Sequence, residues 1–334
     1  MTAPVTVGVS LKTYFGNARA RAWFAEVAPR LQAHPAIADG RVRFFVIPTY
    51  LQIPAAIEAF AESPVLVGAQ DVSAHPPGAF TGEITAAELA EVGVQVAEIG
   101  HAERRRLFGE TDEVTASKAA ASLEHGITPV LCIGEDARMS GADAASANLD
   151  QLAADLEGVP AGPVVVAYEP VWAIGATEPA PDDHIATVTR ALRGAIDADA
   201  GRAGSVVIYG GSAGPGLLAR LDGAADGLFL GRFAHDPDNL LAVIDEAAAL
   251  ADAAANRDTA TVFAGAPAGG ATSDRSRNTR ATTTPAVTPT RCDTASTATG
   301  CASTGTTTSP SSRRRARASC LPTAASSDRS TCAA

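Results

Sequence analysis

Eight short apolar runs recur between Val5 and Gly231, and longer alanine-rich segments separate them. The runs are rich in β-branched residues and do not alternate apolar with polar side chains, which is typical of strands covered on both faces in a parallel sheet. Eight such units match the closed (β/α)8 barrel, which typically takes about 250 residues. The expected strands are Val5–Ser10, Val42–Ile47, Val65–Ala69, Val94–Ile99, Thr128–Ile133, Val164–Tyr168, Val206–Tyr209 and Gly227–Gly231.

The segments between these runs have the apolar spacing of amphipathic helices. An open, doubly wound sheet is the alternative fold, because it has the same order of elements. That fold commonly carries G-x-G-x-x-G after its first strand, and the pattern is absent here. The barrel is therefore favoured. The expected helices are Ala18–Leu31, Pro54–Ala61, Asp112–His125, Ala142–Leu156, Asp182–Ala198 and Asp238–Leu250.

The last part of the 334-residue chain, residues 255–334, has a different composition. It holds ten Arg, no Lys, four Asp and no Glu, with only four sizeable apolar side chains. Such a segment buries too little apolar surface to offset its ordering entropy. We expect one barrel domain over residues 1–254 and a disordered, low-complexity tail over 255–334. The run 313–317 could contact an anionic surface or nucleic acid, or the tail could be frame-shifted read-through of a GC-rich gene.

Charge and cysteine content exclude several classes of protein. The chain carries a net charge of −11, and residues 1–254 alone hold 16 basic and 33 acidic side chains. Scattered basic residues argue against nucleic-acid binding by the barrel. No signal peptide and no apolar run of membrane-spanning length is evident, so we expect a cytoplasmic protein without membrane contact. Cys132 is the single cysteine before the tail, and no spacing suits a disulfide framework or metal site.

Chemistry in a barrel of this kind sits where strands end. Lys12 follows the first strand and is one of only two lysines in the chain, which suggests that a compact ammonium is needed there; a solvated lysine is the alternative. His101 follows the fourth strand at the expected start of a helix, whose N-terminus disfavours imidazolium. A neutral ring there can donate a hydrogen bond to a substrate carbonyl; a core or capping histidine is the alternative.

Glu169 follows the sixth strand beside an apolar Pro-Val-Trp segment. Partial desolvation there raises a carboxyl pKa toward that of a useful general base; a salt bridge at the barrel rim is the alternative. The stretch 170–180 mixes rigid apolar residues with Gly175, which suits a loop that closes as a unit.

Glycine-containing turns follow the last two expected strands, Gly210-Gly211-Ser212 after the seventh and Gly231-Arg232 after the eighth. Small residues let backbone N–H groups approach an anion, and these two loops commonly form the phosphate site of a barrel. Glycines that only make tight turns are the alternative. We favour a substrate with a phosphate group.

These residues together resemble the triosephosphate isomerase family, over residues 5 to 250. The resemblance is carried by segments that occur in the family's order along the chain. They are Val67-Gly68-Ala69-Gln70, Gly78-Ala79-Phe80-Thr81-Gly82-Glu83, His101-Ala102-Glu103-Arg104-Arg105, Phe108-Gly109-Glu110-Thr111, Leu131-Cys132-Ile133-Gly134-Glu135, Tyr168-Glu169-Pro170-Val171-Trp172-Ala173-Ile174-Gly175 and Tyr209-Gly210-Gly211-Ser212.

The resemblance implies an aldose–ketose isomerase that interconverts dihydroxyacetone phosphate and glyceraldehyde 3-phosphate, as in glycolysis and gluconeogenesis. Glu169 would remove a proton next to the carbonyl, His101 would polarise that carbonyl, and Lys12 would stabilise negative charge with Glu103 as its ionic partner. No metal or organic cofactor is implied, and Cys132 is a supporting residue. Ser10 also belongs to the expected substrate site, and the phosphate would be held by Gly175, Gly210, Gly211, Ser212, Gly231 and Arg232.

A homodimer is also implied by the resemblance, because the loop after the third strand inserts into the neighbour's site in this family. That loop would span residues 71–83, with Thr81 as the contact to the partner.

Several positions depart from the family pattern. Ser10 stands where Asn is usual, and Arg232 stands where a second Gly is usual; Ala102 replaces Ser, and Ala176-Thr177 replaces Thr-Gly. Ser10, Gly231-Arg232 and the segment Val46-Ile47-Pro48 resemble a branch that acts on L-erythrulose 1-phosphate in erythritol catabolism. The sequence leaves the triose and the tetrulose phosphate open as substrates. A non-catalytic binding barrel is a third hypothesis, which the presence of Lys12, His101 and Glu169 disfavours.

Overall fold

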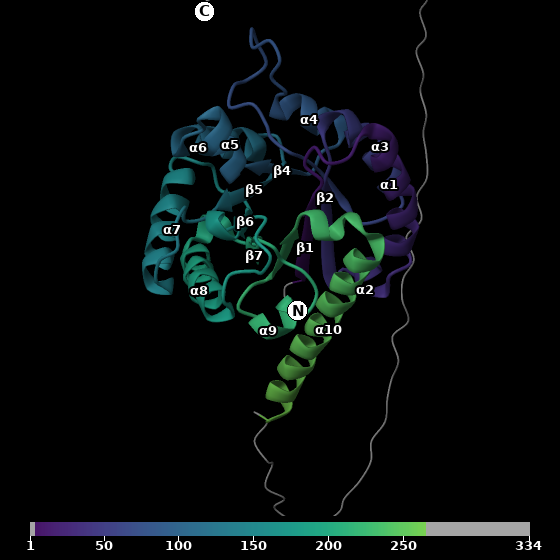
Figure 1. Ribbon diagram of the computed structural model, residues 1–334, viewed down its shortest axis with the longest axis vertical. Coiled ribbons are helices and arrows are strands. Elements are labelled where there is room, and N and C mark those ends of the chain that lie inside the picture. The colour runs from purple at the N-terminus through teal and green to yellow at the C-terminus, as the bar shows by residue number, and fades with distance from the viewer. Residues whose placement is uncertain (1–3, 265–334) are drawn as a thin grey trace, which may run out of the picture. The chain divides into compact units, whose positions relative to one another are not determined.

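The computed structural model describes residues 4–264, and within them eight parallel strands form one closed barrel (Figure 1). Each strand pairs with the next along the chain, and the last returns to the first through the register Thr6↔Gly227. The predicted (β/α)8 barrel is confirmed, and the open sheet is wrong, since no strand is left at an edge. The strands are β1 (Val5–Ser10), β2 (Val42–Ile47), β3 (Leu66–Ala69), β4 (Val96–Ile99), β5 (Thr128–Ile133), β6 (Val165–Tyr168), β7 (Val206–Tyr209) and β8 (Gly227–Leu230).

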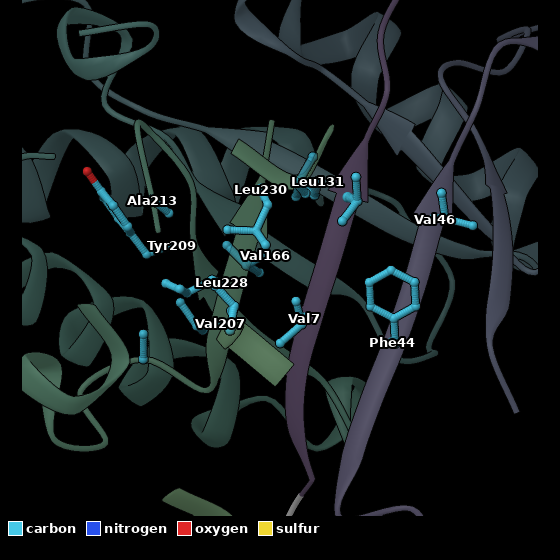
Figure 2. Packing of buried hydrophobic residues seen from close by; sticks show 14 of the residues in the cluster. Val7, Phe44, Val46, Leu131, Val166, Val207, Tyr209, Ala213, Leu228 and Leu230 are labelled. Atoms are coloured by element: carbon cyan, nitrogen blue, oxygen red, sulfur yellow. The ribbon is translucent and has the colours of Figure 1, made fainter. Parts of the chain in front are cut away.

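Both faces of the strands are buried, as their unalternating apolar sequences predict. One set of side chains packs against the surrounding helices and includes Val7, Phe44, Val166 and Leu228 (Figure 2). A second set comes from strands alone and fills the barrel interior. It contains Phe45, Ile47, Val96, Val130, Cys132, Val165, Ala167, Val206, Ile208 and Phe229.

Helices surround the barrel and cover its outer face (Figure 1). The six predicted helices are present with bounds shifted by a few residues at most ends, and a seventh begins after His101, where a helix start was expected. Three further short helices were not predicted, because so few residues show little periodicity. The helices are α1 (Asn17–Gln32), α2 (Pro35–Ala38), α3 (Ile53–Phe60), α4 (Ala86–Val92), α5 (Ala102–Phe108), α6 (Asp112–Glu124), α7 (Gly141–Asp155), α8 (Asp182–Ala198), α9 (Leu217–Leu221) and α10 (Pro237–Ala264), with 3-10 turns at Tyr50–Gln52, Val171–Ala173, Ala200–Arg202 and Arg232–His235.

The fourth strand begins two residues later than its apolar run suggested. The backbone N–H of Val94 donates to the carbonyl of Leu89 at 2.9 Å, after Gly93 has turned into the left-handed region with φ 103°. Val94 therefore closes the end of α4 and cannot start the β4 ladder.

The last helix, α10, passes the expected domain boundary at Ala254 and ends at Ala264. The rest of the predicted tail, with its four cysteines and the arginine run 313–317, lies outside the described residues. Among residues 4–264, no helix has both the length and the apolar character needed to cross a membrane.

Candidate active site

A cavity of about 450 Å³ lies at the carboxyl ends of the strands, where the sequence placed the chemistry. Gly210, Cys132 and Thr81 do not belong to its lining among the described residues. The predicted site residues that line it are Ser10, Lys12, His101, Glu103, Glu169, Gly175, Gly211, Ser212, Gly231 and Arg232.

Lys12 turns its ammonium into this cavity from a strained backbone position with φ 46°. Its Nζ lies 2.8 Å from His101 Nε2 and 3.1 Å from Glu103 Oε2. Burial alone would lower the pKa of Lys12, but the carboxylates of Glu98, Glu169 and Glu103 outweigh it and raise that pKa. The ammonium therefore stays charged. The Lys12 side chain is 21 % exposed and paired with Glu103, so it is not the solvated lysine of the alternative.

His101 caps the N-terminus of α5. The backbone N–H of Glu103 donates to Nδ1 at 3.0 Å, so Nδ1 is an acceptor and the proton of a neutral ring lies on Nε2. The 2.8 Å contact between Nε2 and the Lys12 ammonium is then an approach of two donors and not a hydrogen bond between them. Nε2 in turn lies 3.3 Å from Glu169 Oε2. The capping hydrogen bond thus orients the ring so that Nε2–H faces the cavity. His101 therefore caps the helix and also presents a donor to the site.

Glu169 is 9 % exposed and follows β6. Burial raises the pKa of this carboxyl, against the attraction of His101 and Lys12, and the charge of Glu98 raises it further. Among the described residues, its Oε2 accepts no hydrogen bond of regular geometry, and His101 Nε2 lies 3.3 Å away. A desolvated carboxylate is a stronger base than one in water.

Glu98 was not predicted as a site residue. It lies within β4, is 3 % exposed, and accepts a hydrogen bond from Ser10 Oγ at 2.7 Å. It shares the inward face of β4 with Val96, which belongs to the interior cluster. A carboxylic acid in an otherwise apolar strand was the available signal in the sequence.

The predicted phosphate side of the cavity is formed by Gly175, Gly211, Ser212 and Gly231. Gly175 and Gly211 have φ 71° and φ 99°, where other residues are strained. A Cβ on Gly231 would meet open space, and its φ is −103°. Glycine at 231 is therefore not required by packing or by φ, and it leaves room at the cavity wall.

Gly210 differs from its predicted role. Its backbone N–H donates to the carbonyl of Tyr168 at 2.9 Å in the β6–β7 ladder, so it has no free amide for a phosphate. A Cβ at this position would collide with the carboxylate of Glu169. Gly210 instead makes room for the base, a role that only the tertiary structure reveals.

Arg232 lines the cavity rather than turning away from it. Its Nη2 lies 3.8 Å from the position of a Cβ on Gly175, and its guanidinium carbon lies 5.9 Å from the ring centre of Tyr14. A cation therefore stands at the predicted phosphate side.

The predicted loop, residues 170–180, is fixed at the cavity by hydrogen bonds from β7 and the turn after it. Ser212 Oγ shares its single hydrogen between the carbonyls of Ala173 and Ala176, at 3.1 and 2.7 Å. The N–H of Ala180 donates to Tyr209 Oη at 3.0 Å. At the other end of the loop, Trp172 Nε1 donates to Glu135 at 2.9 Å.

The two remaining predicted residues do not line this cavity. Cys132 is buried in the barrel interior, and burial raises the pKa of its thiol well above the ordinary value. Thr81 lies in an exposed part of the loop 71–83, where His75 stacks on Phe80 at 4.2 Å. In residues 4–264, no group of three or more His, Cys, Asp and Glu side chains is arranged to hold a metal ion.

The barrel and this set of acid, imidazole and ammonium groups define an isomerase of small sugar phosphates. A family model described as triosephosphate isomerase matches residues 5–247, and the chain belongs to this family of aldose–ketose isomerases. An L-erythrulose-1-phosphate isomerase of Pectobacterium atrosepticum is 48% identical over 254 residues, which is 75% of this chain and 98% of the relative. A triosephosphate isomerase of Thermus thermophilus is 42% identical over 228 residues, 65% of this chain and 87% of the relative. An L-erythrulose-1-phosphate isomerase of Mycolicibacterium smegmatis is 37% identical over 257 residues, 74% and 94% of the two chains.

Proposed function

We propose that the chain isomerises a small ketose phosphate by proton transfer between adjacent carbons, with an enediolate as intermediate. Glu169 removes the proton, the Nε2–H of His101 donates to the carbonyl oxygen, and Lys12 stabilises the negative charge that develops there. The observation that carries this proposal is the contact of His101 Nε2 with both Lys12 Nζ, at 2.8 Å, and Glu169 Oε2, at 3.3 Å. Base and donors thus meet at one point of the cavity.

The substrate's phosphate is held by backbone N–H groups and by one added cation, Arg232. The N–H groups belong to Gly175, Gly211, Ser212 and Gly231. The loop 170–180 covers the reacting carbons and excludes water that would promote loss of phosphate from the enediolate. No metal or organic cofactor has a step in this scheme.

We propose L-erythrulose 1-phosphate as the substrate. Support comes from Ser10, which is smaller than the Asn usual in the family, from Arg232, and from the Pectobacterium relative, of which this chain covers 98%. A proton leaves C3 and another is added to C2, so the carbonyl moves from C2 to C3. The product is again a ketose phosphate, now with the phosphate at the far end from the carbonyl.

Dihydroxyacetone phosphate, converted to glyceraldehyde 3-phosphate, is the second candidate substrate. It is favoured by the Thermus relative at 42% identity and needs the same three side chains. Activity with this triose would place the enzyme in glycolysis and gluconeogenesis.

Steady-state kcat/KM for the two substrates tests the proposal. We expect turnover of both, higher for the tetrulose phosphate, and a loss of about 10²- to 10⁴-fold in Glu169→Gln, as for removal of a general base. Glu157→Gln, an exposed change of the same kind, should be as active as the wild type. No turnover of either substrate, or equal rates in wild type and Glu169→Gln, would refute the enzyme assignment. A higher kcat/KM for the triose would refute the substrate assignment alone.

We further propose a homodimer formed through the loop 71–83, supported by its exposed Thr81 and by the dimeric state usual in this family. Sedimentation equilibrium should give a dimer for the wild type and more monomer for Thr81→Arg, because a long cation would not fit the partner's site.

We also propose that the barrel works without the tail. A chain ended after Ala264, which retains the whole of α10, should keep its kcat/KM and its Tm.

A further inference from the structure

We propose that Ser10 determines substrate specificity by accepting a hydrogen bond from the terminal hydroxyl of a ketose phosphate, and that Glu98 positions Ser10 for this. The inference rests on the proposed isomerisation and deepens it. It starts from a buried acid that the mechanism above does not use. Glu98 is 3 % exposed and its Oε2 receives the Ser10 hydroxyl at 2.7 Å.

The hydrogen bond to Glu98 decides whether the Ser10 hydroxyl donates to the substrate or accepts from it. A serine has one hydrogen to donate, and an ionised carboxylate only accepts. With its hydrogen committed to Glu98, Ser10 Oγ can offer only lone pairs to the cavity that it lines. A charged acceptor also polarises the hydroxyl and strengthens its oxygen as an acceptor. Ser10 therefore selects a donor, whereas an asparagine amide could donate.

The cost of this arrangement indicates that it has a function. Glu98 lies on the inward face of β4, where the neighbouring interior side chains are Val96, Val130 and Cys132. A buried carboxylate costs several kcal/mol unless it is paired, and an apolar side chain would fill the same space without that cost. The compensating groups are Ser10 and the ammonium of Lys12, and both line the cavity.

The hydrogen bond between Ser10 and Glu98 crosses the barrel interior. Ser10 ends β1 and Glu98 belongs to β4, two strands that are not neighbours in the barrel. The hydroxyl hydrogen thus points across the interior toward the strand that leads to His101, and the lone pairs of Oγ lie on the other side of the atom. With the phosphate assigned to Gly231, we assign the other end of the substrate to Ser10, which lines the same cavity as Lys12 and His101.

Only a ketose phosphate longer than a triose has a donor left for this position. In dihydroxyacetone phosphate, the single oxygen beyond the carbonyl becomes one of the two enediolate oxygens and faces His101 and Lys12. A tetrulose 1-phosphate carries one more hydroxymethyl group on that carbon. The class of ligand assigned to Ser10 is thus a ketose phosphate with a hydroxyl-bearing carbon beyond the enediol.

The test measures kcat/KM of the full chain with L-erythrulose 1-phosphate, its 4-deoxy analogue and dihydroxyacetone phosphate. We expect the wild type to prefer the tetrulose phosphate over the 4-deoxy analogue by about tenfold or more. Ser10→Ala should abolish that preference, because it lowers kcat/KM for L-erythrulose 1-phosphate more than for the 4-deoxy analogue or for dihydroxyacetone phosphate. Glu98→Gln should weaken the preference, because its amide can donate to Ser10 and release the hydroxyl hydrogen.

Thr6→Val is the matched control. Thr6 lies on the same inward face of β1, fully buried, and its Oγ1 has no hydrogen-bond partner within the described part of the chain. It should keep the wild-type preference. The assignment of Ser10 is wrong if Ser10→Ala lowers kcat/KM equally for all three substrates, or if the wild type does not discriminate against the 4-deoxy analogue. The proposed function stands in either case. A wild type that converts only the triose would instead overturn the proposed substrate and this inference with it. Because Glu98→Gln can destabilise the barrel, its Tm is measured and the single-atom change Ser10→Ala decides.

Discussion

Glu169 Oε2 and His101 Nε2 lie 3.3 Å apart, although their strands β6 and β4 are separated by β5. The carboxylate is buried, and the attraction of His101 and Lys12 offsets only part of the cost of burying its negative charge. The ionised Glu169 is needed as the base, but its buried charge destabilises the fold. Because both effects depend on its protonation, each can be followed as a function of pH.

Glu169→Gln should be more stable than the wild type at neutral pH. Burial raises the pKa of Glu169 above 4.5 in the folded state, so the folded protein binds the proton more tightly than the unfolded chain. The ionised group therefore destabilises the fold fully above the raised pKa, and the penalty fades as pH falls toward 4.5. We expect a gain on the order of 1 kcal/mol at pH 7, as when an uncompensated buried charge is removed. Urea unfolding between pH 4.5 and 8 measures the free energy of unfolding of both proteins. A stability gain of Glu169→Gln that grew as the pH fell would contradict the prediction.

Glu98→Gln should move both limbs of the pH profile of kcat/KM to lower pH. The charge of Glu98 raises the pKa of Glu169, although burial is the largest cause, and it also raises the pKa of Lys12 against the effect of burial. The base must be ionised, so activity is lost as pH falls through the pKa of Glu169, and a lower pKa shifts that loss downward. The substrate phosphate titrates equally in both enzymes, so the difference between profiles isolates Glu98. An unmoved acid limb would mean that the two carboxyls do not interact.

The fold was predictable in detail because strand signals are local. The runs that became β1, β2, β5 and β7 have the predicted bounds, since apolar β-branched residues flanked by turns need no distant partner to be recognised. The site was predictable only where a reactive side chain follows a strand. Glu98 lies inside a strand, and the space that Gly210 leaves for Glu169 depends on a residue from another strand. Such relationships arise from barrel closure and have no signature in a single segment.

Lys118→Met should destabilise the protein by about 3–5 kcal/mol, the usual effect of removing one partner from a buried ion pair. The Lys118 side chain is 5 % exposed and its Nζ contacts Asp71 at 2.6 Å and also Glu110. Arg104 contacts the same two carboxylates and cannot neutralise both. Equilibrium unfolding in urea measures the loss. Arg190→Met removes an exposed cation from α8 and should stay within about 0.5 kcal/mol of the wild type; equal effects of the two changes would mean that the buried network contributes nothing.

Tyr209→Phe should loosen the loop 170–180 without altering the base. Tyr209 Oη accepts from the N–H of Ala180 at 3.0 Å and donates to the carbonyl of Gly211 at 2.9 Å, so phenylalanine leaves two backbone groups unpaired when the loop covers the cavity. That cost is about 1–3 kcal/mol, and we expect kcat/KM to fall by roughly tenfold, since each 1.4 kcal/mol is a factor of ten. An opened loop also admits water to the enediolate, so the ratio of inorganic phosphate to isomerised product should rise. Tyr50→Phe, the same change in the turn after β2, should leave that ratio unchanged. If Tyr209→Phe lowers kcat/KM while phosphate release stays at the wild-type ratio, the loop does not protect the intermediate.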